Sequence, residues 1–445
     1  MYIFPENLFT EVRIEKSECV GYWVRNGEVE SNNQLSVIGA MIRVFDGDMW
    51  YTSVTNDLTQ IQAQINNLAA LAGKNQDIYN HPVIRNFGSH KASVIKYDGE
   101  NDIRKITREQ REKLVGDYVS ACVDSSIKEM KSYQAGYSSS YILKEYYSSK
   151  GAEIKQDMQR CSVMVGYEFT VDGVTTYAGK NIRKFSFEEL KNREQEIRAE
   201  RDRYLDYARN AVDVEPGDYT CVLAPFVTAM FTHESFGHKS ESDYMLNDRM
   251  LQEEWVMGKK VGNEKVSICD SGRINHNGYT PYDDEGNEAG ETWLIRDGVL
   301  TGRLHDSKSA SVLKEEITGN SRAQSYLTEP MVRMTNTYME KGSDDPEKLI
   351  SEVRDGIYVY GVNYGTGSST FTMQPNLCYR IRDGRLCEPV RANVITGSVF
   401  RTLFAIDAVG NDLEIFDTYT CGKNGQIVEV SAGGPTIRVK QLTVN

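Results

Sequence analysis

Two histidines and a glutamate lie close together near the middle of the chain. His233 and Glu234 are adjacent, and His238 follows five positions after His233. Imidazole is the commonest protein ligand of zinc, and a carboxylate beside an activated water can accept its proton. The segment therefore predicts a hydrolytic metal site in which the histidines bind the metal and Glu234 is the general base. The alternative from these residues alone is a pair of structural histidines at a helix end, bound to Glu241 and Asp243.

The spacing of the two histidines restricts the backbone between them. A strand-like run over 220–223 leads to Pro225, and proline is a favoured first residue of a helix. Zinc-binding helices commonly place two histidines at i and i+4, about 40° apart around the helix axis. Here the positions are i and i+5, which a regular helix would place about 140° apart. We therefore expect the helix to end or distort between them, most easily at Gly237.

The elements before this segment show the patterns of a mixed domain. Runs of β-branched and aromatic residues predict strands at 20–24, 36–45, 139–147 and 161–177. Apolar residues at helical spacing predict helices over about 59–72 and 108–130. Asp172–Gly173 is a typical hairpin turn within the last of the strand segments.

A change of pattern divides the chain. Residues 187–211 are rich in Glu and Arg at i, i+4 spacing, which predicts an exposed helix, and we interpret it as a solvated linker. Beyond about residue 214, short strands alternate with turns such as Asp297–Gly298, Asp383–Gly384 and Asn424–Gly425. We therefore predict an α+β fold with three parts. These are an N-terminal mixed α+β domain (1–186), a linker helix (187–213) and a larger antiparallel β-rich C-terminal domain that carries the histidine helix (214–445).

Composition excludes several classes of protein. The 445 residues carry a net charge of −13 without a long run of either sign, which argues against a nucleic-acid partner. The start of the chain lacks the features of a secretory signal, and the most apolar stretch, 221–231, has about half the length needed to span a bilayer. The eight cysteines form no C-x-x-C pairs or dense framework. We expect a cytoplasmic protein with no membrane partner.

Several segments of the C-terminal half resemble the TldD/PmbA family of metallopeptidases, which is also labelled modulator of DNA gyrase. HESFGHKSESD at 233–243 resembles the signature of that family. Four further segments resemble other family blocks, namely 282–302, 330–339, 356–373 and 421–445. The resemblance covers nearly all of the second domain strongly and the first domain more weakly.

This resemblance implies a ligand set and an activity. In the family, zinc is held by the two histidines of the signature and by a cysteine near the C-terminus. The matching residues are His233, His238 and Cys421, with Glu234 as base and one zinc ion per zinc-bearing subunit. Three protein ligands leave a fourth position for water, as catalytic zinc requires. The resemblance thus implies hydrolysis of small or unfolded peptides, held as an added β-strand in an enclosed cavity.

Residues around the signature carry weaker expectations. Glu241 and Asp243 match the family and could orient the ligating histidines. Lys239 and Ser240 depart from the glycine and apolar residue that are common there, which affects the local substrate wall. Three residues in or near matching blocks are candidates to line the cavity, each with a structural role as the alternative: His305, Asn336 and Tyr338.

The family also suggests a partner and two competing functions. It pairs zinc-bearing subunits with related subunits that lack the motif, so we expect a homodimer or a heterodimer with a related subunit. The first competing function is a non-catalytic partner subunit, which is disfavoured because all four catalytic positions are kept. The second is a regulatory binding protein of the gyrase-modulator kind without peptidase activity. The sequence shows no helix-turn-helix or basic stripe to support direct DNA contact.

Overall fold

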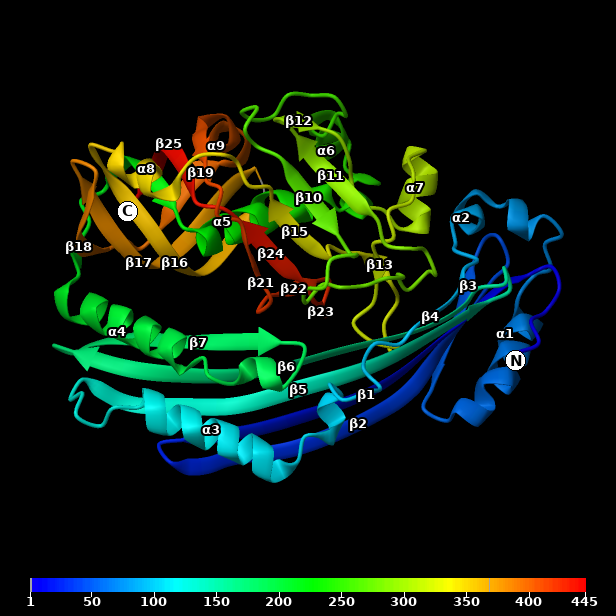
Figure 1. Cartoon of the computed structure of the whole chain (residues 1–445). Coiled ribbons are helices and arrows are strands. Elements are labelled where there is room, and N and C mark those ends of the chain that lie inside the picture. Colours follow the sequence, from blue (N-terminus) through cyan, green and yellow to red (C-terminus); the bar gives the residue numbers. More distant parts are fainter. Residues whose placement is uncertain (1, 368) are drawn as a thin grey trace.

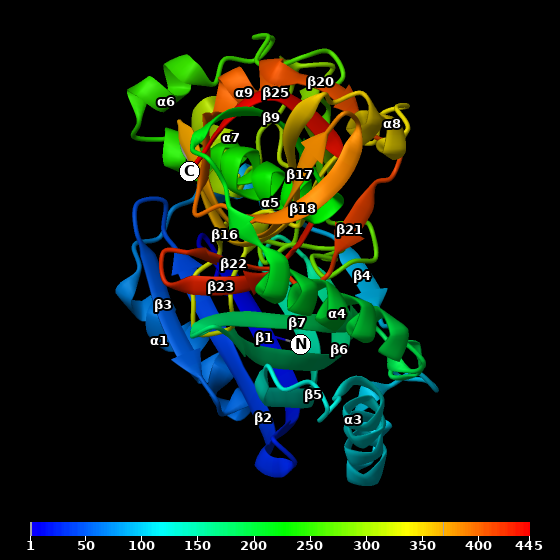
Figure 2. The ribbon, with the colours of Figure 1, turned by 90° about the vertical axis from the view of Figure 1, so that its left-hand side faces the viewer.

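A long curved sheet forms the N-terminal part of the molecule, and a group of smaller sheets and helices packs on its concave side (Figures 1 and 2). The protein is described from a computed structural model that covers residues 2–367 and 369–445. The curved sheet has the order β3-β2-β1-β5-β6-β4, with β7 beside β6. Its strands are β1 (Phe9–Arg25), β2 (Glu28–Phe45), β3 (Trp50–Thr55), β4 (Lys91–Val94), β5 (Met130–Ser148), β6 (Glu153–Val171) and β7 (Val174–Lys184).

Three helices accompany this sheet: α1 (Ile61–Leu71), α2 (Pro82–Arg85) and α3 (Arg108–Cys122). The helices predicted over 59–72 and 108–130 are α1 and α3, although α3 ends at Cys122. The hairpin predicted at Asp172–Gly173 is confirmed, because both residues have positive φ and join β6 to β7. Within residues 2–367 and 369–445, no helix has both the length and the apolar character needed to cross a bilayer.

The helix expected over 187–211 is shorter and less exposed than its charge pattern predicts. It is α4, Glu194–Asn210, and it contacts β6 and β7. One face of α4 buries Ile197, Tyr204 and Leu205. The interpretation as a solvated helix is therefore wrong for this face. Apart from Arg201, which is also buried, the Glu and Arg residues of α4 are at least partly exposed, and their abundance conceals the apolar side in the sequence.

The C-terminal part contains an eight-stranded sheet, a six-stranded sheet and two hairpins. The eight strands are β8 (Val212–Asp213), β9 (Gly217–Leu223), β16 (Asp355–Gly367), β17 (Thr370–Arg382), β18 (Arg385–Arg391), β19 (Ile395–Ser398), β20 (Ile406–Val409) and β25 (Ile437–Val444). The six are β10 (Ile268–Ser271), β11 (Glu291–Arg296), β12 (Val299–Leu300), β15 (Asn336–Met339), β21 (Glu414–Phe416) and β24 (Ser431–Gly434). The hairpins pair β13 (Ser321–Arg322) with β14 (Met331–Val332), and β22 (Thr420–Lys423) with β23 (Gln426–Glu429).

This part is β-rich, as predicted, and the chain as a whole has an α+β fold. The turns at Asp297–Gly298, Asp383–Gly384 and Asn424–Gly425 all have positive φ and close antiparallel hairpins. The pairs β8–β18, β9–β16 and β15–β24 are parallel, so the sheets are mixed rather than purely antiparallel. The division into 1–186, 187–213 and 214–445 stays a proposal, and β8 at the end of the proposed linker pairs with β18 of the C-terminal part.

The helix that carries the histidine segment lies in the main core of the C-terminal part. The helices of this part are α5 (Pro225–Thr232), α6 (Arg249–Glu254), α7 (Ser307–Leu313), α8 (Pro346–Ser351) and α9 (Val399–Ala405). Helix α5 contacts β15, β16 and β24, so it is held between the two large sheets. Its residues Val227, Ala229 and Phe231 belong to the largest buried apolar cluster. The end of α5 is therefore a rigidly packed position.

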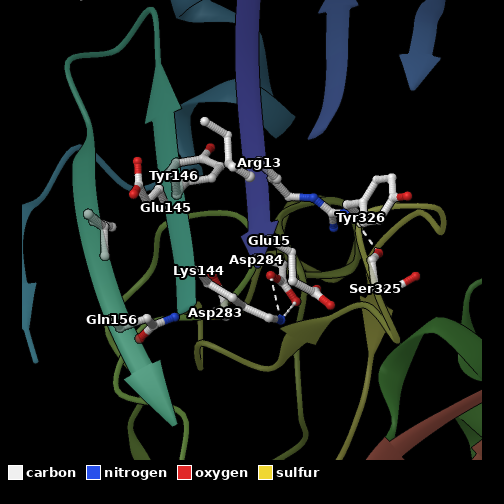
Figure 3. Close-up of a pocket in the computed structure, with 12 residues that line it drawn as sticks. Arg13, Glu15, Lys144, Glu145, Tyr146, Gln156, Asp283, Asp284, Ser325 and Tyr326 are labelled. Carbon is white, nitrogen blue, oxygen red and sulfur yellow. Dashed lines mark hydrogen bonds and ion pairs between the residues drawn. The ribbon is translucent and has the colours of Figure 1, made fainter. Parts of the chain in front are cut away.

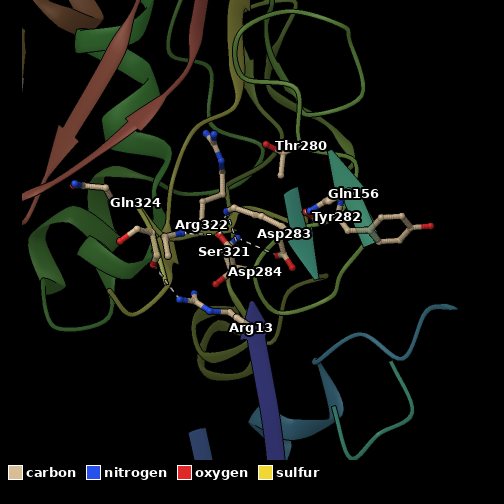
Figure 4. A network of polar contacts seen from close by, with 12 residues as sticks. Arg13, Gln156, Thr280, Tyr282, Asp283, Asp284, Ser321, Arg322 and Gln324 are labelled. Atoms are coloured by element: carbon tan, nitrogen blue, oxygen red, sulfur yellow. Dashed lines mark hydrogen bonds and ion pairs between the residues drawn. The ribbon is translucent and has the colours of Figure 1, made fainter. Parts of the chain in front are cut away.

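Polar contacts join the curved sheet to the C-terminal part through the loop at 281–287. Lys144 on β5 lies 3.0 Å from both carboxylate oxygens of Asp284, beside a small polar pocket (Figure 3). Arg13 on β1 donates to the carbonyl of Thr328 at 2.7 Å. Asp283 accepts backbone N–H bonds from its own loop and from Ser321 (Figure 4). These buried contacts fix how the two parts sit against each other.

Candidate metal centre

The histidine segment continues α5 as a single wide turn. After Thr232 the chain forms a π-helical turn over His233–Gly237, and the N–H of His238 donates to the carbonyl of His233. Such turns bond residues five apart and are frequent at functional sites. The two imidazole rings are thereby brought to a centroid distance of 5.1 Å. The distortion expected from the i, i+5 spacing is confirmed.

Gly237 serves this turn in a different way from the one expected. Its φ and ψ are both −55°, which any residue can adopt, so the freedom of glycine is not used. A Cβ at this position would stand 2.0 Å from Sδ of the buried Met334. The glycine is required because the turn packs closely against Met334, and the helix continues through it.

A hairpin from the end of the chain brings a sulfur to the histidines. Cys421 lies on β22, and its Sγ is 3.4 Å from Nε2 of His238. One ligand atom from each of His233, His238 and Cys421 lies within 4.8 Å of the other two. His233 and Cys421 are buried, whereas His238 is half-buried. The three potential ligands therefore meet at one point, although Cys421 is distant in the sequence.

A charged network supports His238 from behind. Oε2 of the fully buried Glu241 is 3.0 Å from Nδ1 of His238. Lys423 lies 3.3 Å from the same carboxylate and 2.7 Å from Asp243. Glu241 thus contacts His238 directly and Asp243 is linked to Glu241 through Lys423, while an orienting role for both stays a prediction. A hydrogen bond to Nδ1 leaves Nε2 of His238 facing Cys421.

The surroundings shift the pKa values of the ionisable groups at the site. Burial alone would raise the pKa of Cys421, but hydrogen bonds and charge from His233 and His238 lower it to about 5. Burial opposes the charged form of His238, while Cys421 and Glu241 raise its pKa to about 10. Burial also raises the pKa of Glu234. A thiolate is thus favoured at Cys421, and thiolate is the form of cysteine that binds metals.

The donors fit zinc. Two imidazoles and one thiolate are preferred zinc ligands, and three protein donors leave a position open. Nδ1 of His233 is buried and has no hydrogen-bond partner among residues 2–367 and 369–445. A buried ring nitrogen without a partner calls for an explanation, and a role of this imidazole in metal binding would supply one.

A cleft leads to this group. It has a volume of about 700 Å³, and its lining includes His238, Tyr244, Met250 and Gly422. Lys239, which departs from the family pattern, also lines it and pairs with Glu254 at 3.1 Å. Lys239 thus forms part of the cleft wall and connects the histidine turn to α6.

The other sequence candidates lie in packed surroundings. His305 contacts Ser242 at 3.0 Å and Glu315 at 2.9 Å. Asn336 accepts from Gly278 at 2.9 Å and donates to Ser271 at 2.7 Å. Tyr338 lies on β15 between β10 and β24. These contacts are structural, and a role in lining the cavity stays a prediction.

Sequence reasoning missed three neighbours of the ligands. They are Lys423, Arg333, which donates to the carbonyl of Cys421, and Tyr419, whose ring stacks on His233 at 6.2 Å. Lys423 and Tyr419 each stand two positions from Cys421, on the same side of an extended chain. This two-residue spacing from Cys421 is the sequence signal that could have identified Lys423 and Tyr419.

Two imidazoles on a rigid turn, a thiol on a separate hairpin, a neighbouring carboxylate and an open cleft are together typical of the metal-dependent hydrolase class. A family model described as PmbA/TldA metallopeptidase C-terminal domain matches residues 216–445, and one for domain 1 matches residues 10–75. The chain therefore belongs to the TldD/PmbA family of metallopeptidases.

Individual relatives are similar to this chain over nearly its whole length. A metalloprotease of Methanocaldococcus jannaschii is 28% identical over 439 residues, covering 97% of this chain and 95% of the relative. A Saccharolobus solfataricus protein named zinc metalloprotease TldD homolog is 29% identical, with 91% and 89% covered. A Thermotoga maritima crystal structure described as a modulator of a DNA gyrase has a TM-score of 0.79 at 17% identity, with 98% and 96% covered. This last likeness concerns the fold alone.

Proposed function

We propose that this chain is a zinc-dependent peptidase whose ligands are His233, His238 and Cys421. The observation that carries the proposal is the convergence of their three donor atoms within 4.8 Å. Membership of a metallopeptidase family and a relative named zinc metalloprotease support the choice of metal and reaction. The cleft beside His238 gives a substrate access to these donors.

Glu234 is the proposed general base. When bound, zinc would polarise a water molecule and the carbonyl of the scissile peptide bond. Glu234 directly follows a ligand and is half-buried, and burial raises its pKa towards the range in which it can both accept and release a proton. It accepts the proton of the attacking water and passes it to the leaving amine.

Two glycines of β16 hold the segment around Glu234. A Cβ at Gly367 would stand 2.5 Å from the carbonyl oxygen of Glu234, and one at Gly365 would stand 3.4 Å from its Cγ. Gly367 can therefore lie against the histidine turn only because it has no side chain. The glycine-rich strand positions the base and leaves room beside it.

The substrate class and the assembly complete the proposal. The substrates are small or unfolded peptides, which can enter a cleft of about 700 Å³ where a folded domain cannot. The active form is a homodimer or a heterodimer with a related subunit, as the family resemblance implies. Each zinc-bearing subunit holds one ion.

Glu234→Gln tests the mechanism separately from metal binding. We expect the purified variant to retain zinc by elemental analysis and to lose peptide hydrolysis, while a chelator abolishes hydrolysis by the unaltered protein. Unchanged turnover in the variant would remove Glu234 from the mechanism. If the unaltered protein holds no zinc and has no chelator-sensitive activity, a non-catalytic partner subunit or a regulatory binding protein becomes the better assignment.

A further inference from the structure

A second cavity lies between the curved sheet and the hairpin β22–β23. It has a volume of about 330 Å³, and Glu429 of β23 contributes to its lining. Six polar residues of its sheet side, which we call the serine pocket, come from four adjacent strands: Cys19, Asn33, Ser138, Ser140, Arg160 and Ser162. The hairpin lies between the curved sheet and the remaining C-terminal strands (Figure 2).

Strand register places the residues of the serine pocket on one face. Ser140 is directly opposite both Cys19 and Arg160, and Ser138 is directly opposite Ser162. Directly opposed residues in an antiparallel pair project to the same side. The hydroxyls of Ser138 and Ser162 are 2.8 Å apart. Small side chains around Arg160 leave the space that forms the cavity, and Arg183 also lines it.

Arg160 is the unusual member of this pocket. Its side chain is only 7% exposed, and its Nη2 donates to the carbonyl of Asn277 at 3.2 Å. Its Nε has no partner among residues 2–367 and 369–445. A guanidinium carries five N–H donors, so this one is far from satisfied by the protein. Unsatisfied buried donors in a native fold call for an explanation.

The neighbouring carboxylate does not balance Arg160. Oε2 of Glu429 lies 2.8 Å from Nη1 of Arg183 and 2.8 Å from Nδ2 of Asn277. Glu429 is therefore already bonded to Arg183 and Asn277, and it acts on Arg160 through its charge alone. The second carboxylate that acts on Arg160, Asp417, bonds to His276 at 3.0 Å. Burial lowers the pKa of Arg160 by more than these carboxylates restore. An additional negative charge in the cavity would be favourable.

The cavity is also close to the metal centre. Glu429 is the register partner of Thr420, which precedes Cys421. Asn277, which accepts from Arg160, donates through Nδ2 to the carbonyl of Tyr419. The serine pocket therefore lies directly behind the hairpin that carries the sulfur ligand. The hairpin β22–β23 thus contributes Cys421 to the metal centre and Glu429 to the cavity.

We propose that the serine pocket binds the C-terminal carboxylate of the substrate peptide. Arg160 supplies the charge, and the hydroxyls of Ser138, Ser140 and Ser162 supply further donors. Arginine suits this task because its planar fork matches the two oxygens of a carboxylate. The inference rests on the proposed peptidase function, from which it takes the peptide. Free phosphate presents similar oxygens, so the experiment separates the two sources.

Ser140 provides the sharpest test, because its Cβ stands about 5 Å from that of Arg160 as a direct cross-strand partner. Ser140→Asp places a carboxylate beside Arg160, where it would compete with the carboxylate of a bound peptide. Ser140→Asn is a control of the same size without charge. Binding is measured by fluorescence anisotropy in the zinc-loaded Glu234→Gln background. The two labelled hexapeptides lack acidic side chains and differ only in a free or amidated C-terminus.

We expect the free acid to bind about ten-fold more tightly than the amide, the size of a charged hydrogen bond. Ser140→Asp should remove this preference, and Ser140→Asn should keep it. Arg160→Gln should also remove it, and if that variant does not fold, the Ser140 pair still decides. Equal affinity for acid and amide in the unaltered pocket would overturn the proposal.

Two further arms separate the remaining outcomes. Inorganic phosphate that binds through Arg160, together with equal peptide affinities, would assign the pocket to free phosphate and also overturn the proposal. Failure of the peptidase function is recognised independently, as absence of chelator-sensitive cleavage of either peptide by the protein with Glu234. An acid preference that depends on Ser140 and Arg160 would then still support the pocket.

Discussion

Lys423 is expected to contribute strongly to the free energy of unfolding, because it balances the buried charge of Glu241. Its side chain and that of Glu241 are both fully buried, and their charged atoms are 3.3 Å apart. Lys423 also contacts Asp243 at 2.7 Å and donates to the carbonyl of Val332 at 2.9 Å. Although burial opposes ionisation of Glu241, His238 and Lys423 keep its pKa low. The carboxylate is therefore charged and depends on these partners.

Lys423→Met keeps the length of the side chain and removes its charge. Breaking one partner of a buried ion pair costs about 3–5 kcal/mol, because the other charge is left uncompensated. Oε1 of Glu241 has no hydrogen-bond partner within the described residues, so the contact of Oε2 with His238 alone remains to offset the lost one. We expect a loss of about 3–5 kcal/mol in the free energy of unfolding, measured by urea denaturation at pH 7 with chelator present.

Lys265→Met is the matched control. Lys265 pairs with Asp344 at 2.8 Å, but its side chain is 44% exposed. A pair of this kind is worth about 0–1 kcal/mol. The double variant Lys423→Met/Glu241→Gln should recover part of the loss, because the buried charge is also removed. Equal effects of Lys423→Met and Lys265→Met, or no recovery in the double variant, would refute this reasoning.

Three further predictions follow from the geometry. Gly237→Ala should lower the free energy of unfolding by about 1–3 kcal/mol, because the added Cβ would overlap Sδ of Met334. Met334→Ala in the same chain should relieve this overlap. Additive effects of the two substitutions would contradict the contact. A chelator should lower the thermal midpoint of the unaltered protein, because zinc present at 100 times its Kd stabilises the folded state by about 2.7 kcal/mol. Cys421→Ala should abolish this effect of the chelator. A chelator effect that persists in the variant would show that the sulfur is not a ligand. Burial raises the pKa of Asp283 to about 7, so the folded protein keeps a proton that the unfolded chain releases near pH 4. The free energy of unfolding should therefore fall as pH rises from about 4 to 7, with a smaller slope in Asp283→Asn; an identical slope would exclude Asp283 as the source.

Local chemistry explains the parts of the fold that the sequence predicts well. Asp172–Gly173 and Asn424–Gly425 form turns because residues of these types tolerate positive φ wherever they stand. The wide turn after His233 follows from spacing alone, because two ligands at i and i+5 require a distorted helix. The family, and with it the proposed role of Cys421, follows from short segments that each resemble a known block.

Long-range contacts decided the rest. The buried face of α4 depends on β6 and β7, and helical charge spacing carries no information about what a helix packs against. The sequence indicates that Gly237 matters to the histidine turn. Only the contact with Met334, from a distant segment, shows that close packing is the reason.

The sequence by itself determined the donor types at His233, His238 and Cys421, the need for a distorted turn, and the family. Only the tertiary structure decided that Lys423 balances Glu241 and that Arg160 faces a cavity with unsatisfied donors. The physical reason is that the energy of a buried charge depends on every group around it. Those groups come from strands far apart in the chain, and no local pattern records their distances.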